Sequence, residues 1–188
     1  MKNHEEIYAN IPTLETERLI LRKLSMNDKE DLFEYASEPM VSRFVPWEVH
    51  KTLSDSEEFL ATITNAYEEK RKLTWAIELK EEKKMIGTID FVNWVPKHYR
   101  AELAYVLSHK HWGRGYMMEA ARELIKYGFQ NMNLNRVEAS IIIENKQSQR
   151  VLEKLGLKYE GVAREVFLMK GEFTDLAMYS ILRKEFLQ

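Results

Sequence analysis

The sequence predicts a mixed α/β fold with a partly parallel sheet, and three observations indicate it. Strand and helix patterns alternate through the middle of the chain in the order strand, helix, strand, helix, strand, which is typical of parallel crossovers. Strands joined by short turns add antiparallel pairs on either side. The 188 residues are 45% hydrophobic and 31% charged, which allows a sizeable core. No linker, low-complexity tract or repeat divides the chain, so we expect one domain over residues 1–188.

The first expected elements are a strand over residues 18–24 and the helix that follows it. Apolar side chains alternate with others in the strand, which indicates a period of two. Asn27, with Glu30 three residues later, is a helix-start signal, and Pro39 ends the helix. A polar arm precedes these elements.

A loop that carries Trp47 leads to a second helix, for which Ser54 and Glu57 form the expected capping box. Apolar residues then recur every three or four positions, which gives the helix one buried face. Two strands follow, over residues 74–79 and 84–94. The short charged turn between them favours antiparallel pairing.

The second half of the chain alternates strands with helices. The strand at residues 100–108 is apolar on both faces, as expected for a central strand. Gly156 closes the last helix, because glycine readily adopts the left-handed conformation that ends helices. The remaining predicted elements are helix 116–130, strand 136–143, helix 145–155 and strands at about 157–168 and 173–183.

Composition and charge narrow the classes of function. The chain has no cysteine, which excludes disulfides, thiolate nucleophiles and zinc fingers. Its formal net charge is −2 and its pI is near 6.3, whereas nucleic-acid binders are usually basic. The first twelve residues lack the apolar core of a signal peptide, and no run approaches the ~20 apolar residues of a membrane span. We therefore expect a cytoplasmic protein without nucleic-acid or membrane partners.

A glycine turn between a strand and a helix is the most informative local feature. Gly113 and Gly115 stand directly before the predicted helix 116–130. Glycine lets the backbone approach a ligand closely, and the helix start adds free N–H donors, so such a turn can bind phosphate or diphosphate. A tight turn without a ligand is the alternative. Met118 replaces the third glycine of a dinucleotide fingerprint, and no P-loop sequence occurs.

Four motifs occur in order: ETERLILR at 15–22, AELAYVL at 101–107, WGRGYMMEA at 112–120, and RVEA at 136–139 with NKQSQRVLEKLG at 145–156. Together they resemble the GNAT superfamily of N-acetyltransferases, specifically its ribosomal-protein N-terminal (Rim-type) branch. The resemblance covers residues 13–186, which would form the domain core. It departs from the usual pattern at Lys110, where glutamine or arginine is common. It implies a single-domain GNAT fold, with a mixed, centrally splayed sheet of about six to seven strands and flanking helices.

The resemblance implies acetyl-CoA as donor and direct transfer to a primary amine in a ternary complex. The expected acceptor is a protein N-terminal α-amine. The alternatives are a small-molecule amine (antibiotic, toxin or polyamine) and a non-catalytic acyl-CoA-binding module. A homodimer is a further expectation, and no metal is expected. By resemblance, the cofactor contacts are Tyr105, Val106 and Leu107 on a strand, Gly113, Arg114, Gly115, Tyr116 and Met117 in the turn, and Asn145 and Ser148 on a helix.

Acetyl transfer needs a base for the amine, a donor for the oxyanion and an acid for the thiolate. Glu102, on the strand expected to line the cofactor, is the first candidate base, with an ordinary ion-pair role as the alternative. Glu138 and Glu165 are weaker candidates on neighbouring strands. By resemblance, the backbone N–H of Val106 is the oxyanion donor. Ser148 is the candidate acid, with capping of its own helix as the alternative.

Two departures from the family pattern leave the acid and the base open. Leu152 stands where many relatives carry a catalytic tyrosine. Phe167 stands where Rim-type relatives carry a base glutamate. The sequence therefore predicts the reaction more firmly than it predicts the groups that perform it.

Histidines and aromatic residues near these motifs also have ordinary interpretations. His109 and His111 alternate just before the glycine turn, but no cysteine or aspartate lies nearby, so we expect exposed loop residues rather than metal ligands. Trp47, Trp94 and Tyr99 are candidates to line the acceptor groove, and core packing is the alternative.

Overall fold

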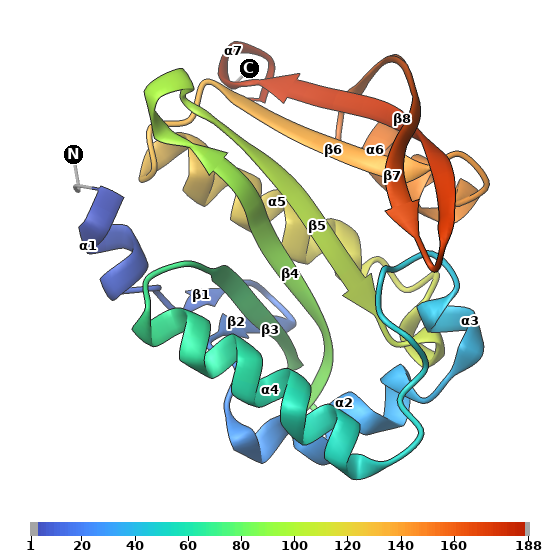
Figure 1. Cartoon of the computed structure of the whole chain (residues 1–188). Coiled ribbons are helices and arrows are strands. Elements are labelled where there is room, and N and C mark those ends of the chain that lie inside the picture. Colours follow the sequence, from blue (N-terminus) through green and yellow to red (C-terminus); the bar gives the residue numbers. More distant parts are fainter. Residues whose placement is uncertain (1–3, 187–188) are drawn as a thin grey trace.

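The computed structural model describes residues 4–186, in which one eight-stranded mixed sheet carries helices on both faces (Figure 1). The strand order is β1-β2-β3-β4-β5-β6-β8-β7. Within these residues β5 and β6 pair in parallel, and the other neighbouring strands pair antiparallel. The strands are β1 (Leu14–Glu15), β2 (Leu19–Arg22), β3 (Leu73–Leu79), β4 (Lys84–Val95), β5 (Arg100–Leu107), β6 (Arg136–Ile142), β7 (Lys158–Met169) and β8 (Glu172–Leu182).

The α-helices of residues 4–186 are α1 (His4–Ala9), α2 (Lys29–Ala36), α3 (Pro39–Ser42), α4 (Leu53–Glu68), α5 (Tyr116–Gln130), α6 (Lys146–Lys154) and α7 (Arg183–Phe186). Short 3₁₀ turns cover Met26–Asp28, Pro96–His98 and His109–His111. Figure 1 shows α4 in front of the sheet and α5 behind it. Between residues 4 and 186, every helix is too short or too polar to span a bilayer.

The predicted α/β fold is confirmed, and α5 covers the predicted residues, Tyr116–Gln130. The sheet has eight strands rather than six or seven, because the two-residue β1 is too short to show a period in the sequence. The polar arm contains α1, which buries Ile7. Pro39 ends the α2 region as predicted but also begins α3, because proline is favoured in the first turn of a helix.

The start of α4 differs from the predicted capping box. The carboxylate of Asp55, rather than Glu57, accepts hydrogen bonds from the backbone N–H groups of Lys51 and Thr52, at 2.7 and 2.9 Å. The N-cap is therefore Thr52, two residues before the predicted cap Ser54, and the helix begins at Leu53. Thr52 with Asp55 and Ser54 with Glu57 have the same three-residue spacing, so the sequence pattern could not select between them.

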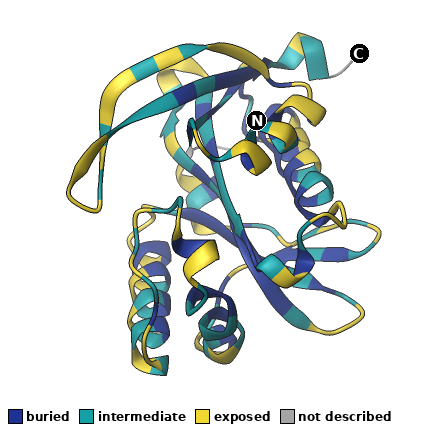
Figure 2. Cartoon of the chain, turned by 90° about the vertical axis from the view of Figure 1, so that its right-hand side faces the viewer, coloured by how far each residue is buried: buried dark blue, intermediate teal, exposed yellow. Residues whose placement is uncertain are grey.

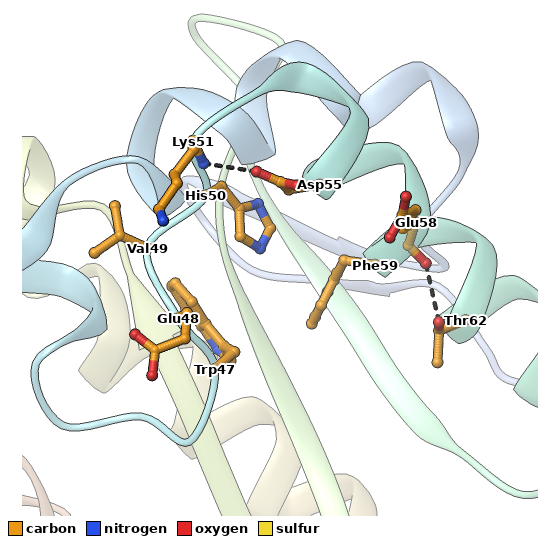
Figure 3. Close-up of a pocket in the computed structure, with 9 residues that line it drawn as sticks. All are labelled: Trp47, Glu48, Val49, His50, Lys51, Asp55, Glu58, Phe59 and Thr62. Carbon is orange, nitrogen blue, oxygen red and sulfur yellow. Dashed lines mark hydrogen bonds between the residues drawn. The ribbon is translucent and has the colours of Figure 1, made fainter. Parts of the chain in front are cut away.

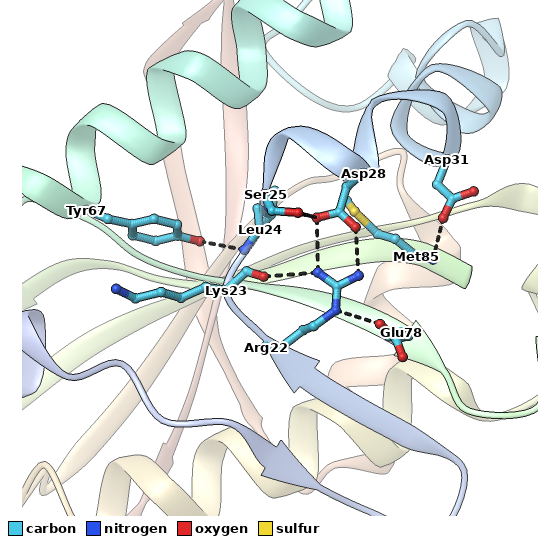
Figure 4. Close-up of polar contacts among 9 residues, drawn as sticks. All are labelled: Arg22, Lys23, Leu24, Ser25, Asp28, Asp31, Tyr67, Glu78 and Met85. Atoms are coloured by element: carbon cyan, nitrogen blue, oxygen red, sulfur yellow. Dashed lines mark hydrogen bonds and ion pairs between the residues drawn. The ribbon is translucent and has the colours of Figure 1, made fainter. Parts of the chain in front are cut away.

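A cluster of polar residues fixes the start of α2 on the sheet (Figure 4). Asp28 is 3% exposed and accepts hydrogen bonds from Arg22 Nη2 at 2.6 Å and from the Ser25 N–H at 2.7 Å. Arg22 Nε also donates to Glu78 of β3 at 2.5 Å. The helix-start pair is thus Ser25 with Asp28, two residues before the predicted pair. Arg22, the last residue of the first motif, joins β2, β3 and α2.

The β7–β8 hairpin extends from the sheet and returns toward α3 (Figure 1). At its tip, Lys170 Nζ donates a hydrogen bond to the backbone carbonyl of Ser42, at 2.9 Å. Exposed residues gather along the hairpin, as Figure 2 shows, and they include the apolar side chains of Val166, Leu168 and Phe173.

Candidate active site

The two parallel strands at the centre of the sheet separate along their length. β5 pairs with β6 only where Arg100–Glu102 faces Arg136–Glu138. Beyond this point β5 continues to Leu107 and β6 to Ile142 without pairing with each other. We call this opening the fork; Figure 1 shows the two strands diverging there. The predicted central splay is therefore present.

The backbone of β5 directs alternate amides toward the fork. The N–H of Ser108 donates to the Ile86 carbonyl on the β4 side, at 2.8 Å. Because an antiparallel ladder alternates, even-numbered residues of β5 direct their amides to β4 and odd-numbered residues direct theirs to the fork. The amides of Tyr105 and Leu107 thus face the fork. The amide of Val106, the donor implied by the family resemblance, faces β4 instead.

The glycine turn leads directly into the first turn of α5. Gly113 and Gly115 have φ values of +75° and +81°, which only glycine adopts readily. Both glycines and Arg114 between them are exposed. The first turn of α5, from Tyr116 onward, adds N–H groups that lack partners within the helix. The predicted cofactor contacts Gly113 to Met117 are thus a candidate backbone site for a diphosphate, because exposed glycines precede a helix start with free N–H groups.

Ser148 and Tyr105 meet across the fork. Ser148 is 8% exposed, and its Oγ lies 2.7 Å from the phenol oxygen of Tyr105. The start of α6 is capped by the side chain of Asn145, whose Oδ1 accepts from the backbone N–H of Ser148 at 3.1 Å. The Ser148 hydroxyl therefore takes no part in the cap of this helix. Burial raises the pKa of the Tyr105 hydroxyl, so the phenol stays protonated at neutral pH.

Two carboxylates stand side by side where the fork begins, with different surroundings. Glu138 accepts from Arg100 Nη1 at 2.5 Å and from Arg136 Nε at 2.7 Å. Glu102, its partner in the strand pairing, accepts from the neutral amide of Asn93 at 2.8 Å. In residues 4–186, Glu102 makes no ion pair, so of these two carboxylates it is the one not occupied by arginine.

Glu102 and Tyr105 lie on opposite faces of the sheet. Asp90 of β4 accepts from the hydroxyl of Thr74 on β3, and it lies opposite Ala104 on β5. Side chains at even positions of β5 share that face, and side chains at odd positions point to the other. A proton acceptor on one face and a hydroxyl pair on the other suit a reaction in which an amine enters from one side and a thiol leaves on the other.

Of the two weaker candidate bases, Glu138 lies at the fork, and Glu165 lies away from it. Glu165 is exposed at a bulge of β7 with φ of +48°, and Phe167 follows on the same strand. β7 is separated from β6 by β8. Leu152 is completely buried, so the position where many relatives have a tyrosine is part of the core here.

The histidines before the turn are not the exposed loop residues that the sequence predicted. His111 is 7% exposed, and its ring lies 6.0 Å from that of Tyr116; His109 packs edge-on against Trp112 at 6.4 Å. Burial lowers the pKa of His111, so the ring is neutral at pH 7. Within residues 4–186 no cluster of three or more His, Asp or Glu side chains is placed to hold a metal ion.

A pocket of about 440 Å³ lies between the loop after α3 and the first turns of α4 (Figure 3). The ring of His50 lies 5.4 Å from Trp47 and 6.1 Å from Phe59, so three rings follow one another along the pocket. Trp94 and Tyr99, the other two candidates for an acceptor groove, lie elsewhere: Trp94 packs against Tyr8 at 5.4 Å, and Tyr99 is exposed in the turn before β5. The pocket near Trp47 is also lined by the polar side chains of Glu48, Lys51, Asp55, Glu58 and Thr62.

Asp90 is a titratable residue with a raised pKa that was not predicted from the sequence. Its carboxylate accepts from Thr74, and burial raises its pKa to about 6. The sequence does contain an indication of this residue, since an aspartate interrupts the run Gly87–Phe91 of a mostly buried strand. A charged residue in such a run requires a partner or a raised pKa.

Comparisons with known proteins agree with this arrangement. The family model described as "Acetyltransferase (GNAT) domain" matches residues 18–158. The chain is 36% identical over 172 residues to the uncharacterized N-acetyltransferase YoaA of Bacillus subtilis, covering 92% of this chain and 97% of that protein. It is 29% identical to the [ribosomal protein uS5]-alanine N-acetyltransferase of Escherichia coli, covering 89% and 90%. A crystal structure of a GNAT-family acetyltransferase from Bacillus anthracis superimposes with a TM-score of 0.82 at 32% identity, covering 93% of this chain and 100% of that one.

These relatives are acetyltransferases, and they support an enzyme rather than a non-catalytic acyl-CoA-binding module. The chain belongs to the GNAT family and is an N-acetyltransferase that uses acetyl-CoA as its co-substrate.

Proposed function

We propose that the acceptor is a protein N-terminal α-amine and that Glu102 accepts its proton. The observation that carries this proposal is the carboxylate of Glu102 at the fork, hydrogen bonded to the neutral amide of Asn93. An α-amine has a pKa of about 7.7–8.0 and is partly neutral at pH 7, so a carboxylate base suffices, whereas a lysine near 10.4 needs more help. The relative that acts on an alanine of ribosomal protein uS5 supports the same class of acceptor.

The proposed reaction uses both faces of the sheet. Glu102 takes a proton from the amine, directly or through one water, and the nitrogen attacks the acetyl carbonyl carbon. The fork-facing amides of Tyr105 and Leu107 are the candidate donors to the tetrahedral oxyanion. Collapse of the intermediate breaks the C–S bond. The Ser148 hydroxyl protonates the departing thiolate as the Tyr105 hydroxyl, 2.7 Å away, passes a proton to Ser148. Tyr105 recovers its proton from water when CoA leaves, and Glu102 releases the proton of the amine to water, so both groups are restored.

A small cationic amine is the second candidate acceptor, because one observation favours it. The pocket near Trp47 carries three carboxylates, Glu48, Asp55 and Glu58, against the single ammonium of Lys51. Aromatic rings and carboxylates together favour a cation. A polyamine would use this pocket for the part of the molecule that is not acetylated.

Three further expectations remain proposals. We propose that residues 13–186 act as the core of one domain, since a single sheet joins β1 to β7 within the described residues. We propose a cytoplasmic location, where ribosomal-protein acceptors occur. A homodimer is retained as a prediction to be tested by the mass of the protein in solution.

The acceptor is tested by incubating the purified protein with acetyl-CoA and single acceptors, and detecting products by mass spectrometry. The panel contains ribosomal-protein N-terminal peptides with free and blocked α-amines, together with spermidine. We expect one acetyl group on the free peptides and none on blocked peptides that still contain lysine. Acetylation of spermidine alone would replace the first proposal with the second.

The role of Glu102 is tested by Glu102→Gln. We predict that kcat falls by about 100-fold at pH 7, because the base is lost. The deficit shrinks toward pH 9, where the α-amine is neutral without a base. Glu165→Gln, on the exposed bulge of β7, is the matched control and should retain full activity. A loss with Glu102→Gln that is equal at every pH would contradict the base role.

A further inference from the structure

The first sequence motif, residues 15–22, takes no part in the chemistry described above, yet its first half reaches the glycine turn. Thr16 and Arg18 contact Glu119, in the first turn of α5, although they are 103 and 101 residues away in sequence. We call these three residues the clamp. The third motif contains both the turn and Glu119, so the clamp joins two motifs of the sequence.

Three hydrogen bonds and an ion pair hold the carboxylate of Glu119. Its Oε1 accepts from the Thr16 hydroxyl at 2.5 Å and from the backbone N–H of Arg18 at 2.8 Å. Its Oε2 accepts a hydrogen bond from Nε of Arg18 at 2.7 Å and forms an ion pair with Nη2 of the same guanidinium, also at 2.7 Å. Burial alone would raise the pKa of Glu119, but the hydrogen bonds from Thr16 and Arg18 lower it below the ordinary value. The side chain is therefore ionised at neutral pH. It is also only 18% exposed.

The same guanidinium also touches the turn itself. Arg18 Nη1 donates to the backbone carbonyl of Arg114 at 3.1 Å. The guanidinium carbon lies 4.5 Å from the ring centroid of Tyr116. Arg18 Nη2 lies 3.5 Å from where a Cβ on Gly115 would stand. One side chain thus contacts Arg114 and Tyr116 of the proposed diphosphate site and lies beside Gly115 between them.

The ion pair of Arg18 with Glu119 also affects the electrostatic potential at the start of α5. A diphosphate bound at the start of α5 carries negative charge close to Glu119, and an unpaired carboxylate there would repel it. Arg18 supplies the compensating positive charge. By binding the Arg114 carbonyl, it also keeps that oxygen turned to the protein, so the amides of the turn remain directed outward.

We propose that Arg18 is a positioning residue for the diphosphate of acetyl-CoA, which fixes the glycine turn and neutralises Glu119. This inference concerns the donor substrate and does not depend on which amine is the acceptor. Arg18 acts through the turn and through Glu119, and the phosphate oxygens are bound by backbone amides.

The test measures CoA affinity by calorimetry, which requires no acceptor, in Arg18→Gln, Glu119→Gln and the double variant. We expect Arg18→Gln to weaken CoA binding about ten-fold, because it leaves an unpaired carboxylate beside the diphosphate. The double variant should bind CoA more tightly than Arg18→Gln, since removing the carboxylate removes the repulsion. Its remaining deficit relative to Glu119→Gln measures the contacts of Arg18 with the turn. Arg122→Gln, which removes an exposed arginine from the same helix, is the control and should bind CoA normally.

A donor without a diphosphate separates positioning from general damage. With S-acetylpantetheine, Arg18→Gln should keep the wild-type kcat/KM, whereas its kcat/KM with acetyl-CoA falls. Arg18→Lys keeps the charge but not the forked donors, and should weaken CoA binding by about three-fold even if the glutamine variant does not fold. Normal CoA binding by Arg18→Gln, or equal losses with both donors, would overturn the proposal. A double variant as weak as Arg18→Gln would overturn the neutralisation of Glu119, because the loss would then come from contacts of Arg18 that do not involve that carboxylate.

Discussion

The hydroxyl groups of Ser148 and Tyr105 lie 2.7 Å apart, and in the proposed reaction Ser148 protonates the departing thiolate while Tyr105 supports it. We predict that Ser148→Ala lowers kcat by about 100-fold and leaves the KM for acetyl-CoA within about two-fold, because the lost contact acts mainly in the transition state. Tyr105→Phe keeps the ring and removes the relay, so we expect a smaller loss of about ten-fold. Steady-state kinetics with acetyl-CoA measures both.

The control for these variants is Ser54→Ala, which removes an exposed hydroxyl far from the fork. Its kcat should match that of the wild-type protein. A normal kcat for Ser148→Ala would show that the hydroxyl pair only joins α6 to β5.

Asp90 leads to a prediction about stability and pH. Its pKa is about 6 in the folded protein, against 3.8 ordinarily, so the folded state holds the proton more tightly. The stabilisation from this group is complete below about pH 4 and is lost as pH rises through 6. We predict that Asp90→Asn, which keeps an acceptor for Thr74, gains about 2–3 kcal/mol in the free energy of unfolding relative to wild type between pH 4 and pH 7.

Urea unfolding of both proteins at pH 4, 5, 6 and 7 measures this difference. Other titrating groups cancel, because they are common to both chains. A difference that is constant over the four pH values would mean that Asp90 is ionised in the folded protein throughout, as in an ordinary exposed carboxylate.

At the scale of elements, the position of α5 on the sheet sets where the glycine turn lies. A Cβ on Gly128 would stand 2.8 Å from Phe91 Cζ of β4 and 2.9 Å from Leu134 Cδ1, and both side chains are buried. We predict that Gly128→Ala destabilises the protein by about 1–3 kcal/mol through overpacking, although alanine favours helices. Thermal unfolding measures it, with the exposed Gln130→Ala as a control expected to change little. An unchanged melting temperature in Gly128→Ala would show that α5 can shift on the sheet without cost.

At the scale of the whole molecule, acetyl-CoA should bind across the glycine turn and the fork, and therefore stabilise the fold. We predict that acetyl-CoA and CoA, at about 100 times their Kd, add about 2.7 kcal/mol to the free energy of unfolding. For a chain of this size that raises the melting temperature by about 5–10 °C. NADH and ATP at equal concentrations serve as the comparison in a thermal-shift series. A shift with NADH and none with CoA would contradict the cofactor assignment.

The sequence by itself determined the order of the elements, the limits of α5 and the glycine turn. These features depend on residues close together in the chain: a change of period, two glycines two positions apart, and a helix that begins at once. Local conformational preference is enough to specify them. The family resemblance added the central splay, which the pairing of β5 with β6 confirms.

Only the tertiary structure decided which side chains meet. It pairs Ser148 with Tyr105 over 43 residues of sequence, and Glu119 with Arg18 over 101. It also distinguishes Glu102 from Glu138, two carboxylates that look alike in sequence, by giving the second two arginine partners. These outcomes depend on strand register and on the face to which each side chain points, and a shift of one residue in register would reverse every one of those faces.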